Sequence, residues 1–102
     1  MERADLAAEI YDRTHLTGEF LLRSGVVSNE YFDKYLFEAE PALLAAIAAA
    51  IAERIDLTKY DVLAGLEMGG IPIATMLSQI TGLPARFVRK EAKEYGTCRL
   101  AE

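Results

Sequence analysis

The stretch between residues 60 and 90 constrains the fold more than any other part of the sequence. It begins with YDVLAGLE, a nearly continuous apolar run bounded by polar residues, which is typical of a strand buried in a parallel sheet. After MGG, the run IPIATMLSQITG predicts a helix with Pro72 in its first turn and Gly82 at its end. ARFVRK predicts a second strand. A strand, a helix and a strand at this spacing predict a βαβ unit, and therefore a parallel sheet in an α/β fold.

The residues before this unit predict two helices and a pair of strands. Apolar spacing over residues 3–14 predicts an amphipathic helix, which we expect Thr17-Gly18 to break. EFLL and EYFDKYLFE are β-prone runs on either side of RSGVVSN, so we expect a hairpin or a bent pair of strands. In the second run, odd and even positions from 31 to 37 should face opposite sides of a strand. Pro41 should start a helix whose apolar residues recur up to Ile55.

Composition excludes several classes of protein. With 102 residues and no internal repeat, the chain is one domain at most. Its formal net charge of −5 argues against non-specific binding of nucleic acid, which depends on basic surface. The single cysteine, Cys98, has no partner for a disulfide or a zinc site, which favours a reducing cytoplasm. The charged N-terminus does not resemble a signal peptide, and PALLAAIAAAIA is too short to span a bilayer.

The segment LEMGGIP, residues 66–72, is the first candidate site. A strand ends there and a helix begins, and ligands of open α/β sheets bind at such carboxyl ends. Gly69 and Gly70 would let backbone N–H groups approach an anion at the helix N-terminus. The alternative is a tight turn that needs glycine for its own backbone. Glu67 is the acidic residue best placed to matter, either in the turn or toward a ribose or a metal-bound water.

The segment RKEAKEYGTC, residues 89–98, is the second candidate. The segment from position 86 to 99 contains five basic residues and only two acidic ones, which favours a small anionic ligand. Cations on a loop after a strand could close over a pyrophosphate and exclude water. A solvated loop is the alternative. The only histidine, His15, has no neighbours arranged as a catalytic triad.

Three motifs together resemble one enzyme family. FLLRSGVVSNEYFD, DVLAGLEMGGIPIAT and LPARFVRKEAKEYGT, in this order, are similar to the N-terminal half of orotate phosphoribosyltransferase. The resemblance implies the type I phosphoribosyltransferase fold, a parallel sheet flanked by helices with a small N-terminal hood. It implies transfer of phosphoribosyl from phosphoribosyl pyrophosphate to orotate, which yields orotidine monophosphate and pyrophosphate, with Mg²⁺ as cofactor. It also implies a cytoplasmic homodimer in which the lysine loop of one subunit closes over the other subunit's site.

The resemblance assigns roles by position. It places Tyr31 and Phe32 beside orotate, and Arg23 where a basic residue, often Lys, contacts the orotate or phosphate end. Lys93 would be the main catalytic residue. The residues that would hold phosphoribosyl pyrophosphate are Arg89, Lys90, Lys93, Tyr95, Gly69 and Gly70. Tyr95 stands where many members have His, and Gly69 where some have Lys. No metal ligand is assigned.

The family's motif for the 5′-phosphate, two acidic residues followed by a loop rich in Thr and Gly, has no match in this chain. We therefore expect a single partial domain over residues 1–102, inactive alone. It would comprise the helix and hood strands (1–40), part of the βαβ core (41–90) and the start of a catalytic flap (91–102). One alternative is a non-catalytic module for binding or dimerisation. Another is a phosphoribosyltransferase for a different base.

The intact mass of the protein purified from its natural source tests these expectations. A partial enzyme predicts a mass of about twice the 11.3 kDa of this chain, because the phosphate-binding half would be of similar size. A mass of 11.3 kDa would favour the non-catalytic module.

Overall fold

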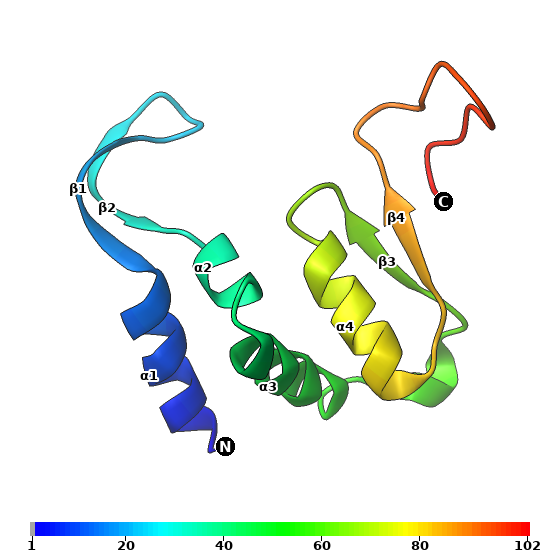
Figure 1. Cartoon of the computed structure of the whole chain (residues 1–102), viewed down its shortest axis with the longest axis horizontal. Coiled ribbons are helices and arrows are strands. Elements are labelled where there is room, and N and C mark those ends of the chain that lie inside the picture. Colours follow the sequence, from blue (N-terminus) through cyan, green and yellow to red (C-terminus); the bar gives the residue numbers. More distant parts are fainter. Residues whose placement is uncertain (1) are drawn as a thin grey trace.

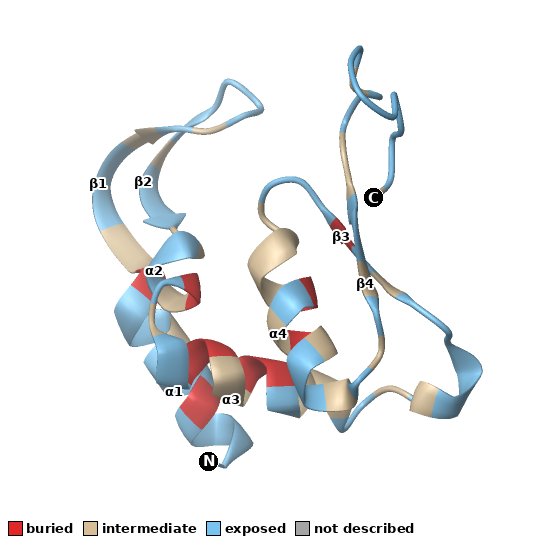
Figure 2. Cartoon of the chain, turned by 45° about the vertical axis from the view of Figure 1, so that its right-hand side comes forward, coloured by how far each residue is buried: buried red, intermediate tan, exposed pale blue. Residues whose placement is uncertain are grey.

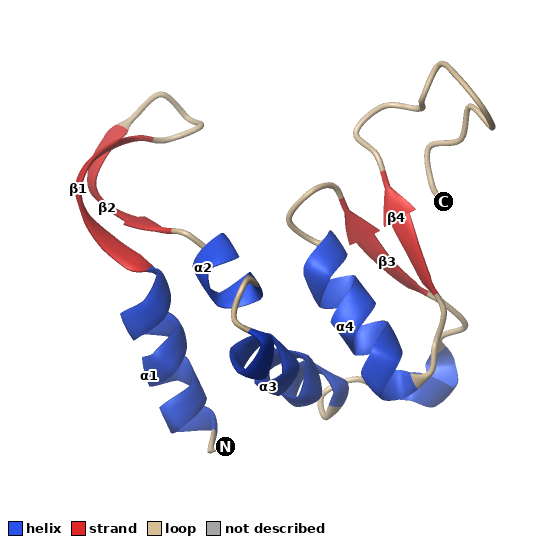
Figure 3. Cartoon of the chain, in the orientation of Figure 1, coloured by secondary structure: helices blue, strands red, loops and turns tan. Residues whose placement is uncertain are grey.

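The computed structural model describes residues 2–102 and has two parts, a helix–hairpin part and a βαβ part (Figures 1 and 3). A short 3₁₀ turn at Leu57–Lys59 follows α3. The elements are, in chain order, α1 (Arg3–Thr14), β1 (His15–Leu21), β2 (Val27–Phe32), α2 (Tyr35–Glu38), α3 (Pro41–Ala52), β3 (Leu63–Leu66), α4 (Ile71–Thr81) and β4 (Ala85–Val88). The predicted helix over residues 3–14 and the predicted helix that stops at Gly82 are confirmed. The helix predicted from Pro41 is also present, but it ends at Ala52 and not at Ile55.

The βαβ unit is present as predicted. β3 and β4 pair in parallel, from Leu63 opposite Ala85 to Leu66 opposite Val88, and α4 connects them. Gly82 ends α4 with φ of 79°, a left-handed conformation that glycine adopts without steric cost. The prediction of a strand buried on both faces is wrong, because α4 covers only one face. Gly65 faces the helix and is buried, whereas Leu66 on the opposite face is 67% exposed.

The hairpin is also confirmed, with different bounds. Helix α1 ends at Thr14, so Thr17-Gly18 does not end it; both residues lie inside β1, where the register with β2 shifts. β2 ends at Phe32, and the predicted alternation of side chains beyond that residue is wrong. The Asp33 carboxylate accepts a hydrogen bond from the Tyr35 N–H (3.1 Å), which starts the short helix α2.

The core lies between the helices (Figure 2). Leu6 of α1 packs with Leu43 and Ile47 of α3, and Ile10 and Phe37 close the cluster. Helix α3 also packs against α4. Since α3 has few side chains larger than alanine between its leucines and isoleucines, it can approach its neighbours closely. This helix layer joins the hairpin to the βαβ unit.

The residues after β4 form a loop that returns to the same strand. Val88 forms an antiparallel bridge with Ala101, and the Arg89 N–H donates to the Leu100 carbonyl (2.9 Å). We call residues 89–102 the C-terminal loop. Its base is therefore tied to β4 along the edge that β3 does not use.

Within residues 2–102, no helix combines the length and the apolar character needed to cross a membrane.

Gly65 allows β3 to lie against the start of α4, and its replacement tests that packing. A Cβ at position 65 would lie 2.5 Å from the Gly70 carbonyl oxygen and 2.9 Å from the Ala74 Cβ. These atoms belong to backbone and helix, so Gly65→Ala should lower the free energy of unfolding by about 1–3 kcal/mol in a urea titration of the full-length protein.

Gly69→Ala is the matched control, because its Cβ would first meet the Lys34 Nζ, the end of a flexible side chain, at 2.9 Å. We expect it to cost clearly less stability than Gly65→Ala. Equal losses would contradict this account of the packing.

Candidate functional site

The turn after β3 is built around a close approach of two backbone segments. The Gly70 N–H donates to the Leu66 carbonyl (2.8 Å), and the Gly70 carbonyl accepts from Ala74 N–H in the first turn of α4 (3.0 Å). A Cβ on Gly70 would lie 2.8 Å from the Leu66 nitrogen, although its φ of −85° suits any residue. Glycine is therefore needed at position 70 for space. The peptide bond between Glu67 and Met68 is cis.

The end of β3 is connected directly to the end of β4. The Glu67 N–H donates to the Val88 carbonyl (2.8 Å), and the Glu67 carboxylate accepts from the Lys90 N–H (2.6 Å). The Glu67 side chain therefore links the turn after β3 to the residues after β4. We call residues 67–70, the turn between β3 and α4, the glycine turn. The glycine turn and the C-terminal loop thus meet at one edge of the sheet, as parallel pairing predicts.

A cavity of about 270 Å³ lies at this edge. Its lining comes from both strand ends, from α4 and from the C-terminal loop: Glu67, Ile71, Phe87, Val88, Arg89 and Glu102. A larger hollow of about 580 Å³ lies between α1 and the start of α3, lined mostly by charged residues such as Glu9, Asp12 and Arg13. We place the candidate site at the smaller one, because only there do strand ends and loop cations converge.

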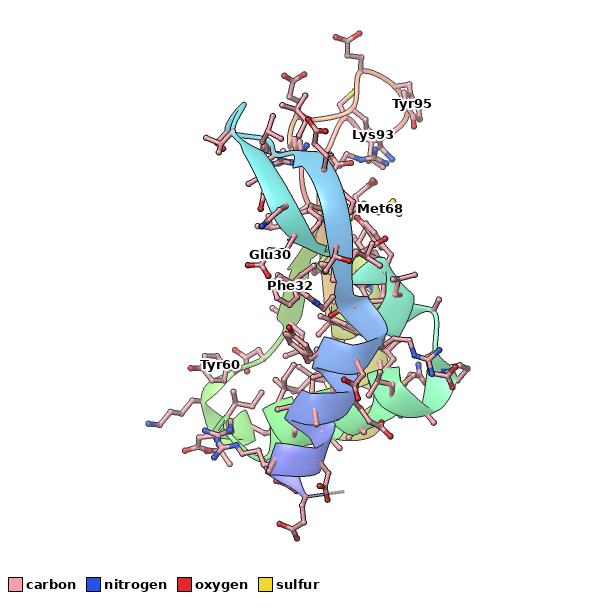
Figure 4. All side chains as sticks on the ribbon, turned by 90° about the vertical axis from the view of Figure 1, so that its left-hand side faces the viewer. Glu30, Phe32, Tyr60, Met68, Lys93 and Tyr95 are labelled. Atoms are coloured by element: carbon pink, nitrogen blue, oxygen red, sulfur yellow. The ribbon has the colours of Figure 1, made fainter. Side chains whose placement is uncertain are left out.

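The cations of the C-terminal loop gather around one carboxylate. Glu102 Oε1 lies 2.7 Å from the Lys93 Nζ and accepts a hydrogen bond from the Thr97 hydroxyl (2.6 Å), while Oε2 lies 3.7 Å from the Arg89 guanidinium. The Lys93 ammonium also lies 5.5 Å from the centroid of the Tyr95 ring. In Figure 4, Lys93 and Tyr95 lie above Met68, which belongs to the glycine turn. The arrangement holds an anionic oxygen group between two cations and a hydroxyl.

The electrostatics of Glu102 follow from these contacts. The hydrogen bond from Lys93, followed by that from Thr97, lowers the Glu102 pKa from its ordinary 4.5 to about 2. The pKa is lowered because each of these groups stabilises the charged form of the carboxylate. Glu102 therefore stays ionised over the physiological pH range, and Lys93 is held with only 14% of its side chain exposed.

The hairpin carries the three residues expected to contact orotate. Arg23 is exposed in the turn between β1 and β2. Tyr31 stacks on Phe20, with ring centroids 5.5 Å apart, whereas Phe32 lies 5.0 Å from the ring of His15. The two neighbouring aromatic residues thus point to opposite faces of β2. The ring of His15 packs on Phe32, and its Nε2 lies 2.9 Å from the Glu30 carboxylate. These contacts do not form a catalytic triad.

The structure brings the loop cations Arg89 and Lys93 together around Glu102 and places the Tyr95 ring beside Lys93. It ties Lys90 to Glu67 of the turn through the Lys90 backbone. Lys34 and Glu102 were not predicted. The Lys34 ammonium donates to the Gly69 carbonyl oxygen and pairs with Glu38 (2.7 Å). The spacing of Lys34 and Glu38 is a signal for such a pair only once that segment is recognised as a helix.

Among residues 2–102, no three Asp, Glu, His or Cys side chains cluster as a metal site. Mg²⁺ is ordinarily held by one or two carboxylates together with substrate phosphates. The side chains of residues 2–102 do not make a Mg²⁺ site by themselves.

Comparisons with curated proteins show which family these features belong to. The chain is 59% identical to an orotate phosphoribosyltransferase from Nocardioides sp. over 99 residues, 97% of this chain and 55% of that protein. It is 49% identical to the orotate phosphoribosyltransferase of Halobacterium salinarum over 85 residues, 83% of this chain and 47% of that protein. The chain is homologous to orotate phosphoribosyltransferases. It spans about half the length of these curated relatives. No family model matches it.

Solved structures agree with this relationship. The orotate phosphoribosyltransferase from Aeropyrum pernix superimposes with a TM-score of 0.76 at 30% identity, covering 95% of this chain and 55% of that one. The Mycobacterium tuberculosis orotate phosphoribosyltransferase in complex with 5-phospho-α-D-ribosyl 1-diphosphate gives 0.67 at 28% identity, covering 98% and 55%. The predicted fold class is confirmed: an α/β arrangement with a parallel sheet and helices, which is part of the orotate phosphoribosyltransferase fold.

The titration of Glu102 tests the arrangement of the loop cations. Because Lys93 is the largest cause of the low pKa, Lys93→Met should raise the Glu102 pKa from about 2 toward 4.5. The measurement is the carboxyl ¹³C chemical shift of Glu102 against pH in the full-length protein.

Because the Glu102 pKa is lowered in the folded protein, its ion pair with Lys93 stabilises the fold only while Glu102 is ionised. The contribution of this ion pair should be complete above about pH 4.5 and should be lost as the pH falls to about 2. A midpoint near 2 in the Lys93→Met variant would contradict the assignment.

Proposed function

We propose that the full-length protein that carries this chain is an orotate phosphoribosyltransferase. It would transfer phosphoribosyl from phosphoribosyl pyrophosphate to orotate, giving orotidine monophosphate and pyrophosphate. The observation that carries the proposal is the 59% identity to the Nocardioides enzyme over nearly the whole chain. The site geometry supports it, since an anion-binding loop and a glycine turn meet at the carboxyl edge of a parallel sheet.

The loop cations have a defined task in this reaction. The bond between the ribose carbon and the pyrophosphate oxygen breaks, and the orotate nitrogen bonds to the same carbon and releases its proton. Negative charge grows on the leaving pyrophosphate. Fixed cations aimed at developing charge are a large term in catalysis. Lys93 is the main catalytic residue of this proposal, with Arg89, Lys90 and Tyr95 binding the pyrophosphate. Since Lys93 and Arg89 now contact Glu102, the pyrophosphate would take that carboxylate's place.

The hairpin is the proposed orotate side of the site. Arg23 would supply a positive charge for the carboxylate or phosphate end, although a guanidinium presents different geometry from the lysine often found there. Tyr31 and Phe32 are the two aromatic candidates for the contact with orotate. Because they face opposite sides of β2, one of them contacts the base while the other packs the hairpin against α1 or β1.

Several further assignments belong to the same proposal. Residues 1–102 would form a partial domain whose site is completed by a 5′-phosphate loop, with Mg²⁺ bound together with the substrate. The protein would be a cytoplasmic homodimer in which the C-terminal loop reaches the partner's site. Exposed apolar side chains at the end of the hairpin, Leu21 (74%) and Val26 (60%), support such an interface. The competing proposal is a non-catalytic module for binding or dimerisation.

Replacement of Lys93 tests the catalytic proposal. In the full-length protein, Lys93→Ala should lower kcat for orotidine monophosphate formation by about 100-fold or more, the loss typical of one fixed electrostatic contact. The absorbance change of orotate with saturating phosphoribosyl pyrophosphate measures it.

Lys59→Ala is the matched control, because Lys59 is exposed in the 3₁₀ turn and away from the sheet edge. Its kcat should equal that of the unmodified protein. Absence of orotidine monophosphate formation by the unmodified protein would favour the non-catalytic module instead.

A further inference from the structure

We propose that Lys34 is a positioning residue of this site, which fixes the peptide between Gly69 and Gly70 with the help of the buried carboxylate of Glu38. This proposal rests on the proposed function for its effect on the substrate. Its structural part, the fixed peptide, stands on contacts within the chain.

Both ends of the Gly69–Gly70 peptide are engaged. The Gly69 carbonyl accepts a hydrogen bond from the Lys34 ammonium, and the Gly70 N–H donates to the Leu66 carbonyl (2.8 Å). A planar peptide held at its oxygen and at its nitrogen cannot rotate without breaking one of these bonds. Lys34 therefore determines which way the negative end of this peptide dipole points.

The orientation matters for an anionic ligand. A free carbonyl oxygen at the N-terminus of α4 would repel a phosphate, whereas the helix end itself favours one. Lys34 turns the oxygen onto a cation and so removes the repulsive group from the turn. One N–H of the Lys34 ammonium donates to Gly69, and the ammonium charge pairs with the Glu38 carboxylate. The Lys34 side chain is still 40% exposed, so positive charge remains open at the turn.

Glu38 holds the lysine in place. Its side chain is only 3% exposed, and within the described residues neither carboxylate oxygen has a hydrogen bond of good geometry. The ammonium 2.7 Å away therefore supplies the charge that makes this burial tolerable. Both residues lie on or beside α2, which the Asp33 side chain starts and which Phe37 packs into the core. The ammonium is thus presented from a well-packed base.

Gly69 is the counterpart of Lys34. A Cβ at position 69 would lie 2.9 Å from the Lys34 Nζ and 3.4 Å from its Cε. The lysine occupies the space into which a side chain at position 69 would grow. Lysine at position 34 and glycine at position 69 therefore form one unit, and replacing either should break the same hydrogen bond.

A double-mutant cycle in the full-length protein tests this unit. We compare Lys34→Met/Glu38→Gln with Glu38→Gln alone, so that no buried carboxylate is left without a partner. Loss of Lys34 should raise the KM for phosphoribosyl pyrophosphate about tenfold, the size of one charge-assisted hydrogen bond, with kcat and the KM for orotate nearly unchanged. Lys34→Arg, which keeps the charge, should restore most of the affinity.

Gly69→Ala supplies the second side of the cycle. It should raise the same KM in the unmodified background and have almost no further effect in the Lys34→Met/Glu38→Gln background, because the bond is already lost. Additive effects, or an unchanged KM for phosphoribosyl pyrophosphate on loss of Lys34, would overturn the proposal.

Hydrogen exchange of the Gly70 N–H separates this proposal from the proposed function. Exchange should be faster in Lys34→Met/Glu38→Gln than in Glu38→Gln, whether or not the protein makes orotidine monophosphate. If the unmodified protein has no such activity, faster exchange still supports the fixed peptide. Unchanged exchange overturns it.

Discussion

The contact of Gly65 with Gly70 is the constraint on which the candidate site depends. A chain that leaves β3 and enters α4 within four residues must pass backbone against backbone, and a single added Cβ would lie 2.5 Å from a carbonyl oxygen. This tight passage sets α4 against β3 and leaves the two strand ends level with each other. The link from Glu67 to Lys90 then needs only one hydrogen bond, of 2.6 Å. The loop cations are consequently delivered to the edge where the glycine turn opens.

The sequence predicted those elements that depend on residues close together in the chain. The parallel strands, the helix between them and its stop at Gly82 follow from apolar runs and glycine placement, and they are present. Helix α2 was missed because its aromatic residues favour a strand, whereas the Asp33 side chain accepts a hydrogen bond from the first residue of the helix. Burial of β3 was overestimated, since the number of layers that cover a sheet cannot be read from one strand. The Lys34–Gly69 contact spans 35 positions, and no pattern over a short window contains it.

The charges of the site are arranged in matched groups. Glu102 engages Lys93 and Arg89, and Glu38 engages Lys34, so each of these three cations is already oriented by a carboxylate. The two groups differ in burial, because Glu38 is nearly inaccessible and Glu102 is partly open. A ligand can therefore replace Glu102 at moderate desolvation cost, whereas Glu38 is fixed by its surroundings. One carboxylate is exchangeable and the other is part of the scaffold.

Residues 100–102 return along β4 and pair with the edge of β4 that does not face β3. The sheet can therefore be extended on one side only. The bridge at Val88 and the paired hydrogen bonds between Phe87 and Glu102 occupy the backbone groups on the outer edge of β4. Within residues 2–102, no strand pairs with the other edge of β3, which lies beside the exposed face that carries Leu66. Any additional strand must join beside β3 and not beside β4.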